Sequence, residues 1–160
     1  MTHLSPAKIN LFLHVISKRD DGYHNLQTIF QLLDYGDKIS FNYRKDGQIN
    51  RIYGNEDIPQ DKDLILRSAN ALKEISGTKD GVDIGVIKNI PTGSGLGGGS
   101  SNAATVLIVL NDLWNLKLPK TELLKIGQTL GSDVPIFISG QSSWAEGTGE
   151  ILTPISLPKY

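Results

Sequence analysis

The fold is decided by one glycine-rich stretch, Pro91-Thr92-Gly93-Ser94-Gly95-Leu96-Gly97-Gly98-Gly99-Ser100-Ser101-Asn102-Ala103-Ala104. It contains five glycines and three serines and runs into an apolar pattern with helical spacing. Glycine lets the backbone adopt positive φ and approach a ligand closely. The free N–H groups at the start of a helix, together with the helix dipole, attract an anion. The stretch therefore predicts a loop that holds a phosphate chain, with the hydroxyls of Ser100 and Ser101 at the helix entrance.

A flexible glycine–serine linker is the alternative interpretation of this stretch. A linker would be followed by polar, aperiodic sequence, whereas Ala103, Val106, Leu107 and Leu110 repeat at the spacing of one helical face. We therefore expect a buried helix that extends to about Asn115. The glycine spacing fits neither a Walker loop nor a strand–GxGxxG–helix unit, so a different nucleotide loop is implied.

The composition bounds the class of protein. A chain of 160 residues can form one compact domain with its own core. Its 16 Lys and Arg nearly balance 17 Asp and Glu, so the net charge gives no argument for nucleic acid or an anionic membrane. It has no cysteine, which excludes disulfides, thiolate metal sites and cysteine nucleophiles. With no signal-peptide pattern and no apolar run of the ~18–20 residues that a membrane span needs, a cytoplasmic protein is expected.

The first half of the chain predicts a mostly antiparallel sheet. Residues 7–16 alternate, with apolar side chains at the odd positions 9–15 on one face and Lys8 and Asn10 together on the other. Further strands are expected around residues 26–33, 38–44 and 48–53. Turn residues at 35–37 and 46–47 predict hairpins between these strands.

The second half alternates predicted helices and strands. A helix is expected from Asp63, its N-cap, to Gly77. After it we expect a strand at 82–90 and a helix at 119–130 that stops at Gly131. A short element from 132 and a hairpin at 142–155, which turns at 147–149, are expected next. Asp133 can cap the short element, so a purely structural role is open for it.

Three motifs carry a resemblance to a known family. They are Pro6-Ala7-Lys8-Ile9-Asn10-Leu11, the run at 91–103 and Gly131-Ser132-Asp133-Val134-Pro135. Together, in this order, they resemble the superfamily of galactokinase, homoserine kinase, mevalonate kinase and phosphomevalonate kinase, over essentially the whole chain. The resemblance implies an α+β fold, a two-layer mixed sheet packed on helices that is shared with some ribosomal proteins. It also implies that residues 1–160 are the ATP-binding, catalytic N-terminal domain and that a C-terminal domain is absent from the chain.

The resemblance assigns the catalytic and ATP-binding residues. Asp133 and Lys8 become the catalytic pair, in which the carboxylate orients or deprotonates the acceptor hydroxyl and the lysine stabilises developing negative charge. Residues 91–101 become the ATP phosphate loop, and Lys88 and Asp63 lie where the superfamily contacts adenine, although asparagine is more usual at 63. ATP implies Mg²⁺, for which no carboxylate here matches the superfamily's glutamate; a hydroxyl of Ser100 or Ser101 with the phosphates is the expectation. Without the resemblance, Lys8 reads as a solvated residue at a strand start.

A fourth motif, Asp21-Gly22-Tyr23-His24-Asn25-Leu26-Gln27-Thr28, concerns the acceptor. It is similar to superfamily members that phosphorylate the 2-hydroxyl of a methylerythritol carrying a cytidine diphosphate group, in the non-mevalonate route to isoprenoids. The resemblance implies that Tyr23 stacks on cytosine, that His24 hydrogen-bonds to it and that Asn10 lies near the reacting hydroxyl. Without the resemblance, the sequence predicts only that Tyr23 is an aromatic residue in a turn and that His24 is a surface histidine.

Three other functions stay open. A sister kinase acting on homoserine, mevalonate or a sugar would have no need of the motif at 21–28. A nucleotide-binding module without catalysis is the second, because a site that lacks one wall is open to water. An RNA-binding protein is the third, although near-zero net charge and no Arg/Lys cluster argue against it. The expected partners are a small-molecule substrate and the chain's own C-terminal domain, with no nucleic acid and no membrane.

Overall fold

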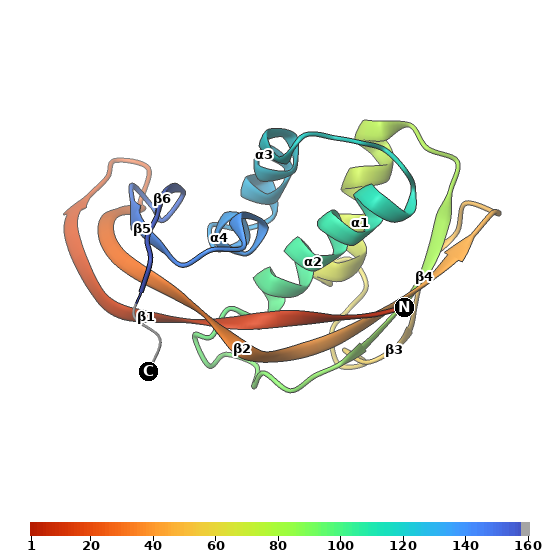
Figure 1. The fold of residues 1–160 in the computed structure, drawn as a ribbon, viewed down its shortest axis with the longest axis horizontal. Coiled ribbons are helices and arrows are strands. Elements are labelled where there is room, and N and C mark those ends of the chain that lie inside the picture. The colour runs from red at the N-terminus through yellow and green to blue at the C-terminus, as the bar shows by residue number, and fades with distance from the viewer. Residues whose placement is uncertain (158–160) are drawn as a thin grey trace.

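The computed structural model describes residues 1–157 and consists of a mixed sheet with helices on one face (Figure 1). The elements in chain order are β1 (Thr2–Lys18), β2 (His24–Arg44), β3 (Ile49–Tyr53), α1 (Leu64–Ser76), β4 (Gly81–Ile87), α2 (Gly98–Leu113), α3 (Lys120–Leu130), α4 (Val134–Ser139), β5 (Ser143–Glu146) and β6 (Ile151–Pro154). The prediction of an α+β fold with a mixed sheet packed on helices is confirmed.

The sheet is built around β2. Its path is β3-β4-β2-β5-β6, and β1 pairs with β2 as a long antiparallel hairpin. The prediction of a turn at 35–37 is wrong, because β2 continues through it. Gly36 is needed there for a close approach of two strands, since a Cβ on it would lie 2.0 Å from the carbonyl oxygen of Ser5.

The prediction of a hairpin at 46–47 is also wrong. The chain does turn there, but β4 inserts between β2 and β3. As a result β3 pairs with β4 in parallel, and β2 pairs with β4 in the antiparallel sense. Turn residues predict where a strand ends. Which strand pairs with β3 depends on β4, about 30 residues further along the chain.

The helices begin and end close to the predicted positions. The Asp63 side chain accepts a hydrogen bond from the Ile65 N–H at 2.9 Å, and Gly77 closes α1 in the left-handed conformation. Helix α2 buries the predicted apolar stripe, including Val106, Leu107 and Leu110, in the main core cluster. The hairpin of β5 and β6 forms as predicted.

The β1–β2 hairpin extends beyond the helices, and its far end curves out of the plane of the sheet (Figure 1). We call residues 2–10 the proximal part of β1 and residues 11–18 the distal part. In the proximal part Ser5, Ala7 and Lys8 are buried. In the distal part the apolar row lies exposed, with 48% of Leu11 and 62% of Val15 accessible to solvent. The alternation therefore does not mark a buried face, because Lys8 on its polar side is buried while the apolar row from Leu11 onward is exposed.

Candidate active site

The glycine-rich stretch encloses one side of a cavity of about 380 Å³. The other walls come from the start of α1, from residues 88–92 and from Asp133. Gly97 is the N-cap of α2, in the left-handed conformation with φ 76°, and no side chain caps the helix. A Cβ on Gly97 would lie 2.8 Å from Cζ of Phe137 and 3.3 Å from Cγ of Lys8. Only glycine fits this position, and the uncapped first turn of α2 offers its N–H groups to an anion.

The loop is tied to the proximal part of β1. The Lys8 N–H donates to the carbonyl oxygen of Leu96 at 2.9 Å. The buried Ser5 hydroxyl donates to Oδ1 of Asn102 at 2.9 Å and lies 2.8 Å from the hydroxyl of Ser101. Ser101 is therefore buried against β1, whereas Ser100 lines the cavity. Of the two serines considered for a metal ion, the structure leaves Ser100 on the cavity side.

Lys8 contacts Asp133, which lines the cavity, although the two residues are 125 positions apart in the chain. Nζ of Lys8 is 3.4 Å from Oδ2 of Asp133, with 7% and 33% of the two side chains exposed. The same ammonium donates to Oδ1 of Asn10 at 2.7 Å and lies 5.1 Å from the centre of the Phe30 ring. A nearly buried ammonium needs such partners, because an unpaired buried charge is costly.

The alternative structural role of Asp133 is not realised. Asp133 precedes α4 but makes no capping hydrogen bond to it. Its carboxylate instead faces Lys8 and the cavity. The structure thus brings together the residues that three separate motifs single out, namely the pair, Asn10 and the glycine loop.

Lys88 also lines the cavity, and a buried carboxylate orients it. Its ammonium is ion-paired with Asp37, which is fully buried in β2. Oδ1 of Asp37 also accepts the N–H groups of Asn89 and Ile90, at 2.7 and 2.8 Å. The segment that leads into the glycine loop is thereby anchored to β2. The turn pattern at 35–37 gives no indication of this anchor, although an aspartate inside a strand pattern is unusual.

Asp63 lies at the cavity wall but is engaged elsewhere. One oxygen caps α1, and the other accepts a hydrogen bond from Nη1 of Arg51 at 2.5 Å. Only 1% of the residue is exposed. The contact of Asp63 with adenine stays a prediction, while its structural role in joining α1 to β3 is clear.

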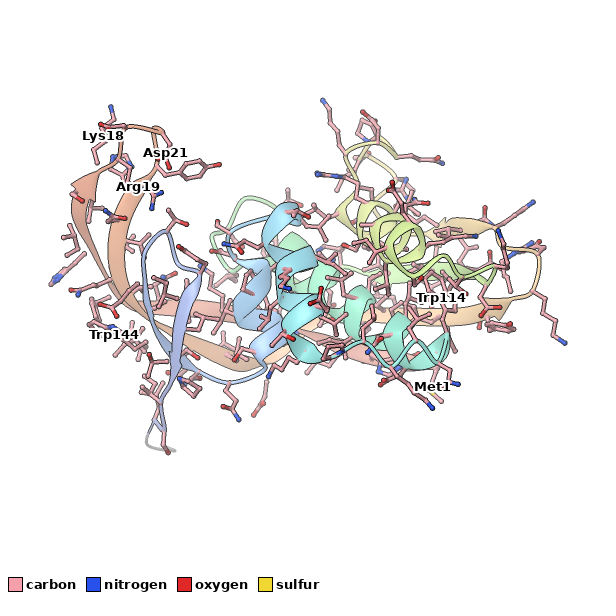
Figure 2. The ribbon with its side chains drawn as sticks, turned by 90° about the horizontal axis from the view of Figure 1, so that it is seen from above. Met1, Lys18, Arg19, Asp21, Trp114 and Trp144 are labelled. Atoms are coloured by element: carbon pink, nitrogen blue, oxygen red, sulfur yellow. The ribbon has the colours of Figure 1, made fainter. Side chains whose placement is uncertain are left out.

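Tyr23 and His24 lie at the far end of the β1–β2 hairpin. Figure 2 shows their neighbours Lys18, Arg19 and Asp21 at the tip, at the opposite end of the molecule from Trp114. Tyr23 is 62% exposed, and neither residue lines the cavity. The structure therefore places Asn10 beside the Lys8–Asp133 pair but leaves Tyr23 and His24 on an open surface.

Residues 1–157 contain neither a cluster of metal-ligating side chains nor a helix that spans a membrane. No group of three or more His, Asp or Glu side chains in this part of the chain could hold a metal ion. No helix among these residues is both long enough and apolar enough to cross a membrane.

Comparison with known proteins identifies the class. Residues 63–141 match the family described as GHMP kinases N terminal domain. The structure superposes on a crystal structure of 4-(cytidine 5'-diphospho)-2C-methyl-D-erythritol kinase with a TM-score of 0.84 and 40% sequence identity, covering 99% of this chain and 56% of that one. The chain belongs to the GHMP kinases, whose initials stand for the four enzymes named above, and it has the fold of their N-terminal domain.

Within this class the chain is similar to one particular enzyme. It is 58% identical over 159 residues, 99% of its length, to the 4-diphosphocytidyl-2-C-methyl-D-erythritol kinase of Ruthia magnifica subsp. Calyptogena magnifica. The mevalonate kinase of Methanococcus jannaschii, at 16% identity and a TM-score of 0.70 over 98% of this chain and 56% of that one, shares the fold. The chain spans 56% of the length of the Ruthia relative.

Proposed function

We propose that the chain is the ATP-binding and catalytic N-terminal domain of a kinase that phosphorylates the 2-hydroxyl of 4-diphosphocytidyl-2-C-methyl-D-erythritol. The observation that carries the proposal is the Lys8–Asp133 pair at the edge of a cavity built on a glycine loop. The names of the 58% identical relative and of the 40% identical solved structure support the choice of acceptor.

The cavity suits a nucleotide triphosphate. The N–H groups at the start of α2 offer positive charge to its phosphates, and Lys88, which lines the same cavity, stays the predicted contact with adenine. Bound ATP supplies the phosphoryl group, and Mg²⁺ neutralises its charge. Mg²⁺ is commonly held by one or two protein oxygens together with phosphates. The Ser100 hydroxyl, which lines the cavity, fits that donor set.

The catalytic pair suits transfer to an alcohol. The acceptor oxygen forms a bond to the terminal phosphorus while the bond from that phosphorus to the departing ADP oxygen breaks. Asp133 orients the acceptor hydroxyl and takes its proton, and its one-third exposure leaves room for that hydroxyl. Lys8 stabilises negative charge on the acceptor oxygen, and Asn10 holds Lys8 in place.

We also propose that the cytidine end of the acceptor reaches Tyr23 and His24, along the curved hairpin. This end has no second wall among residues 1–157. The relatives' additional length is proposed to form a C-terminal domain that covers the exposed row of Leu11, Leu13 and Val15. Exposed apolar residues in a contiguous row are typical of a surface that another domain covers.

The test is ADP release with ATP and Mg²⁺, measured with the diphosphocytidyl acceptor, homoserine and mevalonate in parallel. It is run on residues 1–160 and on the longer protein that contains them, with Asp133→Asn as the inactive control. Turnover with the diphosphocytidyl acceptor alone supports the proposal, and turnover with another acceptor contradicts it. ATP binding is measured directly in the same samples. Binding of ATP without turnover of any of the three acceptors would identify a nucleotide-binding module without catalysis.

A further inference from the structure

Thr28 is a buried polar residue of β2 that lies outside the Lys8–Asp133 pair and the glycine loop. None of it is exposed to solvent. Its hydroxyl donates to the carbonyl oxygen of Phe12 at 2.5 Å and accepts a hydrogen bond from Nδ2 of Asn10 at 2.8 Å. Thr28 therefore contacts the residue that in turn contacts Lys8.

A β-bulge makes the first of these contacts available. Asn10 is paired with Phe30 and Leu13 with Thr28, so Leu11 and Phe12 of β1 stand opposite a single residue of β2. The extra residue interrupts the ladder, and the Thr28 hydroxyl donates to the Phe12 carbonyl at this point. Bulges next to functional sites re-aim side chains, and this one lies directly after Asn10.

Three hydrogen bonds link Phe12, Thr28, Asn10 and Lys8, and in each of them only one of the two groups can be the donor. A threonine hydroxyl has one proton, and here Phe12 receives it. Toward Asn10 the hydroxyl oxygen can therefore only accept, which turns the amide nitrogen of Asn10 to Thr28 and its Oδ1 to the Lys8 ammonium at 2.7 Å. The reversed amide would direct N–H groups at the ammonium, which has no acceptor site.

We propose that Thr28 is a positioning residue, whose hydroxyl fixes the orientation of the Asn10 amide and through it holds the Lys8 ammonium beside Asp133. The proposal rests on the proposed function, in which Lys8 and Asp133 act on the acceptor. It also gives the bulge of β1 a role, because the bulge supplies the carbonyl oxygen that orients the threonine hydroxyl.

The kinetic test compares Thr28→Val, which keeps the shape and removes the hydroxyl, with Thr28→Ser, which restores it. For the longer kinase we expect Thr28→Val to lower kcat by about two- to tenfold, because the oriented hydrogen bond that the Asn10 amide donates is lost. The KM for ATP should stay within about twofold, and Thr28→Ser should recover most of kcat. Thr129→Val is the matched control, since the Thr129 hydroxyl also donates to a backbone carbonyl, at 2.8 Å, but in α3.

A second readout does not depend on turnover. In 15N-labelled protein, Thr28→Val should shift the Asn10 side-chain amide and the Lys8 ammonium resonances, while Thr28→Ser should leave both near their wild-type positions. If the wild-type kinase uses none of the acceptors, the proposed function fails and these resonances still decide the role of Thr28. Thr28→Ala replaces Thr28→Val if the latter does not fold, as judged by circular dichroism.

Two results would overturn the inference. One is an unchanged kcat together with unchanged Asn10 and Lys8 resonances in a folded variant without the hydroxyl. The other is a parallel loss of melting temperature, ATP affinity and kcat that Thr28→Ser does not rescue, because that pattern belongs to a residue that only supports the fold.

Discussion

The two ends of the β1–β2 hairpin differ sharply although the same two strands form both. At the proximal end Ser5 and Lys8 are buried and hydrogen-bonded to the glycine loop and to Asn10. At the distal end Leu13, Val15 and Tyr23 are 53–62% exposed. The ends differ because helices cover only one of them: α2 begins against the proximal part, and the helices do not reach the tip (Figure 1).

The difference indicates how far this chain carries the proposed function. The proposed nucleotide side of the site is lined by groups that belong to the chain itself, whereas the proposed acceptor side is an open surface. Burying a Leu or Val side chain contributes about 1.5–3 kcal/mol, so the exposed row of β1 offers a covering domain a large gain. Substitutions at the proximal end should therefore have larger effects than those at the tip.

The largest expected effect comes from the proposed catalytic pair, Lys8 and Asp133. Asp133→Asn and Lys8→Met should each lower kcat of the longer kinase by about 10²- to 10⁴-fold, the usual contribution of a positioned acid–base group. ATP should still bind, because neither change removes the N–H groups of the loop. Turnover and ATP binding are measured on the same samples, with Glu122→Gln as the control, since Glu122 is ion-paired with Lys125 on the surface of α3. Normal turnover in either variant would remove the pair from the mechanism.

The next largest effect compares two glycines with the same sign of φ. Gly97→Ala at the proximal end should weaken ATP binding by at least about tenfold, because a left-handed alanine costs roughly 1–2 kcal/mol and its Cβ would also press on Phe137. Gly22→Ala at the tip has φ +86° but no atom within 4 Å of the added Cβ. It should leave the dissociation constant for ATP unchanged. Equal losses of ATP affinity in both variants would contradict the contrast between the two ends.

Local chemistry explains what the sequence predicted well. The glycine loop and α2 follow from glycine's backbone freedom next to a helical apolar stripe, and the ends of α1 follow from the Asp63 cap and Gly77. Each of these signals lies within a few residues of the feature that it predicts. The hairpin of β5 and β6 is predictable for the same reason.

What the sequence did not predict depends on contacts between distant residues. The residues around Gly36 predict a turn, and only the close approach of Ser5 explains the glycine. Asp37 acquires its structural role from Lys88 and Ile90, which lie more than 50 residues later in the chain. Periodicity gave no indication of the Lys8–Asp133 contact, which only the resemblance to a family predicted. The orientation of Asn10 by Thr28 depends on a bulge that no pattern of apolar residues records.

At the tip, Tyr23→Ala should act on one substrate only. Loss of a stacking partner typically costs about 1–3 kcal/mol per base, so the KM for the diphosphocytidyl acceptor should rise by at least about fivefold. The KM for ATP should not change, because Tyr23 lies outside the cavity. Tyr43→Ala is the control, since Tyr43 is also exposed and hydrogen-bonds to Asp80 near the other end of β2. An unchanged acceptor KM would remove Tyr23 from the acceptor site.

The smallest expected effect concerns the turn that carries Tyr23. Asp21 accepts the Tyr23 N–H at 3.1 Å, and that hydrogen bond, together with the Arg19 side chain, holds the pKa of the Asp21 carboxyl below its ordinary value of 3.8. Because the pKa is lower in the folded state, the turn is fully stabilised above that ordinary value and loosens as the pH falls through the folded one.

Asp21→Asn should therefore speed hydrogen exchange of the Tyr23 amide at neutral pH and raise the acceptor KM by less than Tyr23→Ala does. The midpoint of global unfolding should stay the same, because the Asp21 side chain is about half exposed and the proximal end does not depend on it. The variant and the wild type should converge in exchange rate, once corrected for intrinsic chemistry, as acid protonates the wild-type carboxyl. A change in ATP affinity in this variant would show instead that the two ends of the hairpin are coupled.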